Sequence, residues 1–396
     1  MMSRKKIPTQ TNISIKHKTQ LGFNLIELMV SITIGLIILA TLSALYLNIT
    51  SSNSEMAKTN LQIENGRFAI QFLENDVVHA GFWGDFVPQF DDLTLSSTPA
   101  DVPTAAPSIC LAYNATNWNT AYKNNIIGIA VQTFDDVPAG CSTVVTNKKA
   151  NTAVLVVRHA DTCVAGAANC EADTAGKLYF QASLCQAPLP SNMTADLSPY
   201  ILDTANFNTL HKRSCVSADK VTDKRNFISN IYYVRDYAKT VGDGIPTLVR
   251  SQFDLSGGTL AHQAPVALIE GIEGFNIELG IDSLSDSGAA VNYSQAVTWA
   301  DNTNLTSPTN RGDGSPDGTF KICTTAAPCT AADLTNVVAV KLYVLARNRE
   351  LTRGYTDSKT YNLGSTTLGP FNDQFKRHAF STSVRLINIS TRRETP

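Results

Sequence analysis

The segment that decides the fold is residues 16–49, KHKTQLGFNLIELMVSITIGLIILATLSALYLNI. Its basic beginning ends at Leu21-Gly22, and the apolar run that follows contains a single charged residue, Glu27. The 22 residues from 28 to 49 carry no charge. As a helix they would reach about 33 Å, which is enough to cross a hydrocarbon core of about 30 Å. The sequence therefore predicts a helix of membrane-spanning length with one acid at its start.

Glu27 needs a partner, because a carboxylate at the edge of a membrane segment costs a few kcal/mol unless it is neutralised. Cleavage between Gly22 and Phe23 would create an amino terminus one helical turn away from Glu27. The same amine on a neighbouring subunit could serve equally well. This arrangement predicts that cleavage of the chain is linked to assembly.

Residues 22–30, GFNLIELMV, resemble the class III signal of type IV pilins and pseudopilins. The resemblance implies cleavage after Gly22 by a prepilin peptidase, N-methylation of the new terminal Phe23, and a role for Glu27 in subunit recruitment. An ordinary secretory signal has a shorter apolar region and a cleavage site after it. A plain signal anchor fits the length, but it leaves Glu27 and the Gly-Phe junction unexplained.

The charges around this segment predict its orientation. Residues 1–22 hold five basic residues and no acid, whereas the far flank is mixed, so the leader is expected to stay in the cytoplasm. Removing these five from the 32 Lys and Arg leaves 27 against 34 Asp and Glu. We expect no direct binding of nucleic acid by such an acidic product. The five residues are Arg4, Lys5, Lys6, Lys16 and Lys18.

The helix is expected to continue beyond the apolar run, through residues 50–80. Residues 51–78 contain no proline and one glycine, Gly66, and then Gly81-Phe82-Trp83-Gly84 ends the pattern. Residues 23–49 would be the half in the membrane or filament core, and residues 50–80 an amphipathic half packed on a head. The expected apolar stripe is Ala57, Leu61, Phe68 and Phe72, with Ile70, Leu73 and Val77 beside it.

Residues 81–396 are predicted to form a large antiparallel β-rich head, so the fold class is α+β, and their number could hold two lobes. Residues 338–346 alternate apolar and polar side chains, which is typical of a sheet with one wet face. Strands are expected in the apolar runs 126–131, 153–157, 231–234, 266–269, 337–345 and 379–389. Surface loops are expected at 96–108, 162–175 and 301–318.

All eight cysteines follow the apolar run, and an even number in an exported domain indicates disulfides that staple the head. The two short loops favour Cys163 with Cys170 and Cys323 with Cys329. The pairing of the other four stays open, since eight cysteines allow 105 connectivities. These four are Cys110, Cys141, Cys185 and Cys215.

Several motifs carry a second resemblance, one at the end of the long helix and four in the head: 67–73 with 79–84, 244–250, 269–275 with 280–282, 340–347 and 377–386. In this order they resemble the PilW family of minor pilins. The resemblance implies a subunit that joins other minor pilins in a complex that primes pilus assembly and lies near the pilus tip. Unlike many major pilins, the chain has no proline between residues 23 and 88, which leaves Gly35 as the weak point of the first half.

No enzyme motif is present: the six histidines are scattered, and neither a zinc-protease helix, nor a nucleophile elbow, nor a phosphate loop occurs. No cofactor or metal is expected. Residues 313–318 imitate the start of a calcium loop, but Thr324 stands where the bidentate glutamate should be. His159-Ala160-Asp161 and Arg311-Gly312-Asp313 are assigned no role.

The resulting prediction is a single-pass inner-membrane precursor with a periplasmic head, which matures into a subunit of the surface pilus. Its expected partners are other minor pilins and the major pilin through the helix, the prepilin peptidase, and a tip adhesin. Twitching motility would follow from the pilus. Two alternatives stay open: a type II secretion pseudopilin, and an adhesive tip subunit that binds through loops 162–175 and 301–318.

Overall fold

The computed structural model describes residues 22, 24–185, 198–213, 215 and 221–395. The chain divides into two compact units, residues 1–56 and residues 57–396. One helix contributes to both, and all strands belong to the second unit.

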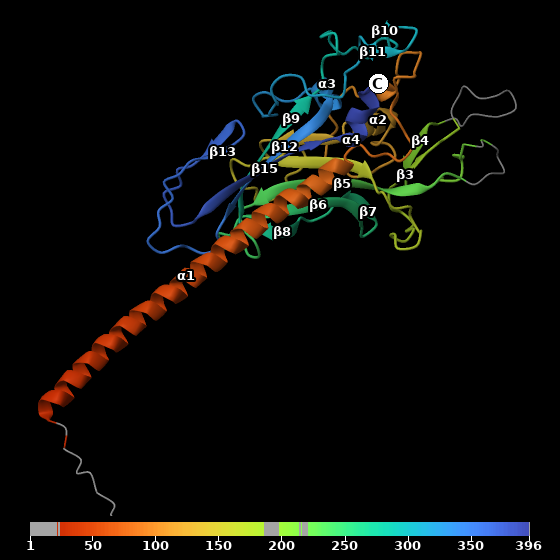
Figure 1. The fold of residues 1–396 in the computed structure, drawn as a ribbon. Helices are drawn as coiled ribbons and strands as arrows, with labels where there is room; N and C mark the ends of the chain where they lie inside the picture. Colours follow the sequence, from red (N-terminus) through yellow and green to blue (C-terminus); the bar gives the residue numbers. More distant parts are fainter. Residues whose placement is uncertain (1–21, 23, 186–197, 214, 216–220, 396) are drawn as a thin grey trace, which may run out of the picture. The chain divides into compact units, whose positions relative to one another are not determined.

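Helix α1 runs without interruption over Leu25–His79 (Figure 1). In residues 25–56, which belong to the first unit, the large apolar side chains are exposed. Hydroxyl side chains near its start bond back to the helix: Ser31 Oγ donates to the Glu27 carbonyl at 2.7 Å, and Thr41 Oγ1 donates to the Ile38 carbonyl at 2.8 Å. These residues therefore add no unsatisfied donor to an otherwise apolar surface.

The larger sheet of the head has eight strands, all paired antiparallel. Five strands follow the order β1-β2-β5-β3-β4, and β6 pairs with β5, β7 and β8. β2 is buried along its whole length, which includes Arg158 and His159 beyond the predicted apolar run 153–157. The strands are β1 (Val131–Phe134), β2 (Val154–Ala160), β3 (Tyr179–Ala182), β4 (Tyr200–Asp203), β5 (Lys224–Arg235), β6 (Thr247–Ser256), β7 (Thr259–His262) and β8 (Val266–Glu270).

The smaller sheet has the order β15-β12-β9, again antiparallel. Its strands are β9 (Ile272–Ile281), β12 (Val337–Arg347) and β15 (Arg377–Arg385). The prediction of alternation along β12 is correct, but the second face is less wet than expected. Lys341 lies 3.9 Å from the centre of the Phe320 ring, and the Tyr343 hydroxyl donates to Glu278. Two hairpins complete the strands: β10 (Trp299–Asp301) with β11 (Thr306–Pro308), and β13 (Tyr361–Leu363) with β14 (Thr366–Leu368).

Two predicted strands were wrong in part, because part of each segment is helical. Helix α2 covers Thr120–Gly128, where the Asn119 side chain accepts the Tyr122 N–H, so residues 126–128 end a helix and β1 starts only at Val131. The predicted strand 379–389 stops at Arg385 and continues as helix α4 (Ile387–Arg393). The remaining helices are η1 (Gln89–Asp91) and α3 (Ala331–Thr335), which Thr330 and Asp333 start as a capping box.

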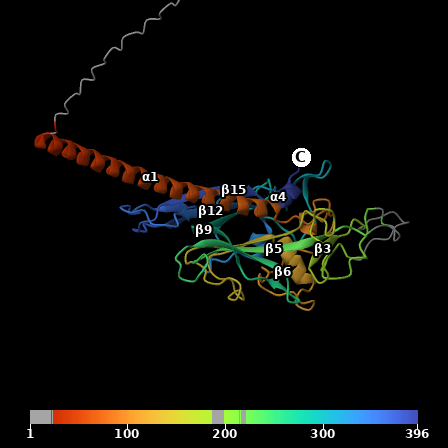
Figure 2. The same cartoon turned by 90° about the horizontal axis from the view of Figure 1, so that it is seen from below.

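The apolar stripe of α1 is rotated from the predicted position. The buried residues are Gln62, Gly66, Ala69, Ile70, Leu73 and Val77, at spacings of three and four. Leu61 and Phe68, which were expected to face the head, are 42% and 53% exposed. The prediction counted only large apolar side chains, whereas Gln62 and Gly66 form the amino-terminal part of the buried stripe. Figure 2 shows this part of α1 beside β15 and β12.

One core cluster joins this helix to both sheets. It contains Leu73 of the helix, Val157 and Tyr232 of the larger sheet, and Phe275 and Val340 of the smaller sheet. A second cluster surrounds Trp83, which follows the helix and is 1% exposed. The second unit therefore folds around the end of α1.

Four disulfides staple the head, in agreement with the predicted fold class. The short-loop pairs Cys163–Cys170 and Cys323–Cys329 are both formed, and the other four cysteines pair as Cys110–Cys141 and Cys185–Cys215. The last two close loops of 31 and 30 residues in sequence separation. Such cross-links limit the unfolded chain and so favour the folded head.

Candidate assembly site

The predicted processing segment lies at the start of α1. Gly22 is exposed, and no heavy atom lies within 4 Å of the position where a Cβ would be. Phe23 lies outside the described residues. Glu27 stands in the first turn of the helix, and its Oε2 accepts the Asn24 backbone N–H at 3.2 Å. A carboxylate at this position favours the helix start because it faces the positive end of the helix dipole.

The apolar side chains after Glu27 have no protein around them in this structure. The most apolar 18-residue window of α1 has a mean hydropathy of 2.4, and none of it is buried. Leu25 is 72% exposed and Ile37 is 64% exposed. α1 is therefore long and apolar enough to cross a membrane, as a membrane anchor requires.

Amide side chains hold the second half of α1 to the edges of two sheets. Gln62, which is 4% exposed, donates through Nε2 to the carbonyls of Ala346 at 2.7 Å and Lys376 at 3.0 Å. Asn65 Nδ2 donates to the Glu270 carbonyl at 3.0 Å. These bonds reach the ends of β12, β15 and β8, so they set the rotation of the helix on the head.

Gly66 lies where the helix comes closest to β15. A Cβ at this position would meet the Phe380 ring at 2.1 Å, well inside contact distance. Only glycine permits this approach without movement of the ring. The close contact explains why the buried stripe runs through position 66 and leaves Phe68 outside.

A buried polar cluster surrounds Asp76 at the end of α1. Its carboxylate accepts from His159 Nε2 at 3.1 Å, from Asn230 Nδ2 at 3.1 Å and from the Tyr232 hydroxyl at 2.9 Å. Burial, followed by the charge of Asp76, raises the pKa of Tyr232 well above its usual value. The cluster places His159 in a structural contact between the helix and the larger sheet.

A second buried ion cluster joins α4 to the same region. Arg393 bonds Asp91 Oδ1 at 2.9 Å, Asp282 Oδ2 at 3.2 Å and Asn336 Oδ1 at 3.0 Å. Burial raises the pKa of Asp282 to about 6, against the opposing effect of Arg393. Asn388 of α4 also donates to the Val78 carbonyl at 3.1 Å, so α4 is fixed to the end of α1. Sequence reasoning missed this cluster because its members are far apart in the chain.

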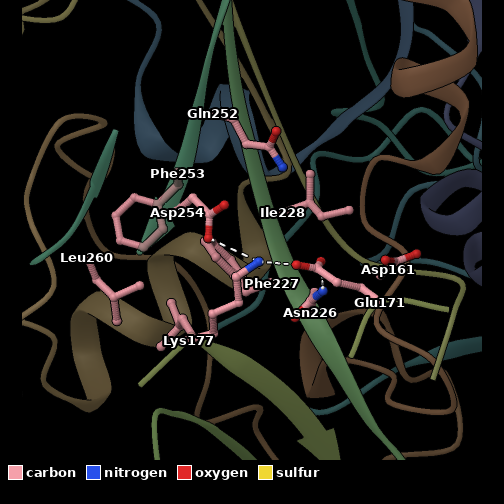
Figure 3. A pocket seen from close by; sticks show the side chains of 11 residues that line it. Asp161, Glu171, Lys177, Asn226, Phe227, Ile228, Gln252, Phe253, Asp254 and Leu260 are labelled. Carbon is pink, nitrogen blue, oxygen red and sulfur yellow. Dashed lines mark hydrogen bonds and ion pairs between the residues drawn. The ribbon is translucent and has the colours of Figure 1, made fainter. Parts of the chain in front are cut away.

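The small pocket in Figure 3 is already filled with internal ion pairs, and its cavity volume is about 60 Å³. Lys177 contacts Glu171 and lies 3.2 Å from Asp254 Oδ1, and Asn226 Nδ2 donates to Glu171 at 2.6 Å. Burial opposes the lysine charge, but its hydrogen bonds to the two acids prevail and raise the pKa of Lys177. This pocket is far below the volume of typical ligand sites. Its contacts hold the segment that follows the Cys163–Cys170 loop.

Residues 313–318 use their carboxylates within the chain. Asp317 Oδ2 accepts the N–H groups of Ser283 at 2.6 Å and Leu284 at 2.7 Å, and Asp313 Oδ1 accepts the Ser315 N–H at 2.7 Å. Among the residues that the structure describes, no group of three or more His, Cys, Asp or Glu is placed to hold a metal ion. The segment is a hydrogen-bonded turn.

A family model and a solved structure of another protein match this chain. Residues 231–388 match the family model of PilW, the type IV pilus-assembly protein W. The matching solved structure is that of the type IV-like pilin TTHA1219 from Thermus thermophilus. The two sequences are 18% identical, the match covers 42% of this chain and 70% of that chain, and the TM-score is 0.19. No curated protein matches the chain.

The PilW match begins in β5 and ends in α4, so it includes the whole smaller sheet on which α1 packs. Proteins of this family are structural subunits that associate with other pilus components. The resemblance to the PilW family that the sequence motifs indicated is thereby confirmed over residues 231–388, which match the model of this type IV pilus-assembly family.

Proposed function

We propose that this protein is a minor pilin that primes assembly of the type IV pilus and is incorporated near its tip, as a structural subunit without catalytic activity. The observation that carries the proposal is the exposed apolar surface of α1 beyond Glu27, on which no residue of the most apolar window is buried. Such a surface is stable in lipid, and it is equally stable against similar helices. Assembly can therefore move the helix from one to the other without exposing it to water.

Maturation would prepare this transfer. Residues 1–22 are a cytoplasmic leader that a prepilin peptidase removes after Gly22, and Phe23 is then N-methylated. The amine of Phe23, or that of an adjoining subunit, neutralises Glu27. In the structure Glu27 Oε2 already lies 3.2 Å from a backbone nitrogen at the helix start, so its carboxylate faces the side from which an amine would approach.

The size of the head supports a place at the tip. More than 300 residues fold around the end of α1 with four disulfides, which is large for a subunit that tiles the side of a filament. The head would be periplasmic before assembly and lie on the cell surface afterwards. Its partners would be other minor pilins, the major pilin and a tip adhesin.

Deletion of the gene tests the proposal, with surface pili and secreted enzymes measured in parallel. Loss of pili is the expected result. Loss of secretion with normal pili would instead identify a type II secretion pseudopilin, and normal pili with lost attachment would identify an adhesive subunit. Either result would contradict priming.

Two substitutions test the proposed roles at the helix start. Glu27→Ala should leave processing intact and lower the number of pili, because the acid no longer pairs with an amine. Glu64→Ala is the matched control, since Glu64 lies exposed on the second half of the same helix. Replacing Gly22 with a bulky residue should leave a precursor about 22 residues longer on a gel.

A further inference from the structure

We infer that the outer edge of β15 receives an extended strand from the head of a different pilus subunit. The inference rests on the proposed function, because it names the surface through which the assembled heads would meet. β15 is the outer strand of the sheet β15-β12-β9 and pairs with β12 over nine residues without a register shift.

The direction of each peptide group in β15 follows from the hydrogen bonds of β9. Leu279 exchanges both of its backbone bonds with Lys321, on the side away from β12. In an antiparallel sheet the backbone N–H and C=O groups of successive residues point to opposite neighbouring strands. Because the groups of Leu279 point away from β12, those of its partner Val340 point to β15, where they meet Val384. Thr382 and Val384 bond to β12, whereas Ser381 and Ser383 point their N–H and C=O groups outward.

These outward groups are accessible. Ser381 and Ser383 are exposed, and within the described part of the chain no hydrogen bond to their backbone is found. The middle of β15 lacks the usual protection of an edge strand: residues 377–385 contain no proline, no lysine and no bulge, and their two arginines, Arg377 and Arg385, stand at the ends. Small side chains at both positions let another backbone approach closely. This is the arrangement used for strand addition.

The direction of α1 excludes antiparallel pairing of β15 with the β15 of a second copy. Gln62 bonds Lys376, Gly66 lies against Phe380, and Val78 bonds Asn388, so residues 62–78 of α1 run along β15 in the same direction. Antiparallel pairing of two β15 edges would place residues 62–78 of the two helices in opposite directions. Helices that enter one membrane or one filament run parallel, so this pairing of identical edges does not occur, and the occupant that we infer is a strand of another subunit.

A proline substitution tests the edge, since proline removes an outward N–H and is tolerated only where that group is not needed by the sheet. Ser383→Pro should lower the number of surface pili, because the loss of one backbone hydrogen bond weakens the binding of the added strand by up to about tenfold. Ser383→Ala keeps the N–H and should give normal pili. The melting temperature of the full chain in detergent should be similar for both variants. Normal pili with Ser383→Pro would overturn the inference.

A photo-crosslinker keeps the test decisive if the proline variant fails to fold. With p-benzoylphenylalanine at position 383, irradiation of piliated cells should yield an adduct with a different pilus subunit, identified by mass spectrometry. The same probe at Val266 on β8, which is 62% exposed, is the control. An adduct only with a second copy, or none, would contradict the inference. If deletion of the gene abolishes pili while these tests fail, the proposed function stands without this contact.

Discussion

The two halves of α1 have similar helical geometry and opposite surroundings. In residues 25–56 the large apolar side chains are exposed, whereas in residues 57–79 Ala69, Leu73 and Val77 are fully buried. Ser31 and Thr41 of the first half bond back to their own helix, whereas Gln62 and Asp76 of the second half bond to the head. The difference shows that the head buries the apolar side chains of the second half, whereas those of the first half require lipid or another subunit to cover them.

The most direct test of this comparison is to truncate a leucine in each half. Leu73→Ala should lower the free energy of unfolding of the head by about 3 kcal/mol, since Leu73 is 0% exposed and its loss leaves a cavity. Urea unfolding of the detergent-solubilised chain, followed by tryptophan fluorescence, measures it. Leu36→Ala is the matched control, because Leu36 is 60% exposed and should leave this value unchanged. Equal effects of the two substitutions would show that the halves do not differ as described.

The two glycines of α1 sharpen the comparison, because alanine should act in opposite directions. Gly66→Ala should destabilise the head by about 1–2 kcal/mol, since its Cβ would displace the Phe380 ring. Gly35 has no heavy atom within 4 Å of a new Cβ, so Gly35→Ala should favour the helix by up to about 1 kcal/mol. Thermal unfolding followed by circular dichroism measures both. Combining Gly66→Ala with Phe380→Leu should recover part of the loss, and an unchanged loss would exclude this contact as its cause.

The smallest expected effect is a pH dependence of the head's free energy of unfolding, caused by Asp101. Asp101 accepts the N–H groups of Gln89 at 2.7 Å and Phe90 at 3.3 Å, and burial raises its pKa to about 6. Between pH 4 and 6 the folded head therefore binds more protons than the unfolded chain, so this group's contribution to stability falls as pH rises. After allowance for its partial exposure, the fall is roughly 1 kcal/mol.

Asp101→Asn should remove this fall, because an amide does not titrate in this range. The measurement is the difference in unfolding free energy between variant and wild type at pH 4, 5, 6 and 7, which cancels the contributions of other acids. The variant should become relatively more stable as pH rises. A difference that is constant with pH would exclude Asp101 as the source.

Much of the fold follows from the sequence because it depends on local patterns. The uncharged run predicts the first half of α1, and the alternation in residues 338–346 predicts β12. The buried face of the second half was mispredicted because Gln62 and Gly66 are not apolar: their burial depends on the carbonyls of Ala346 and Lys376 and on the Phe380 ring. No pattern near position 62 reveals partners that distant.

The candidate site divides in the same way. Gly22, Phe23 and Glu27 stand in one short motif, so sequence alone proposes their roles, and these remain predictions. Asp76, by contrast, gains its place from His159, Asn230 and Tyr232 of two strands. Arg393 likewise depends on Asp91 and Asp282, which only the tertiary fold brings together.

The docking of α1 also has a consequence for the timing of synthesis. Asn65 finds its partner 205 residues later in the chain, and Gln62 finds its two partners 284 and 314 residues later. A chain that emerges from its amino end must therefore carry the stripe of residues 62–77 uncovered until most of the head has followed. Contacts of such long range make folding slow. During this interval the apolar face of residues 62–77 is exposed, so the unfinished chain is more prone to aggregate than the folded one.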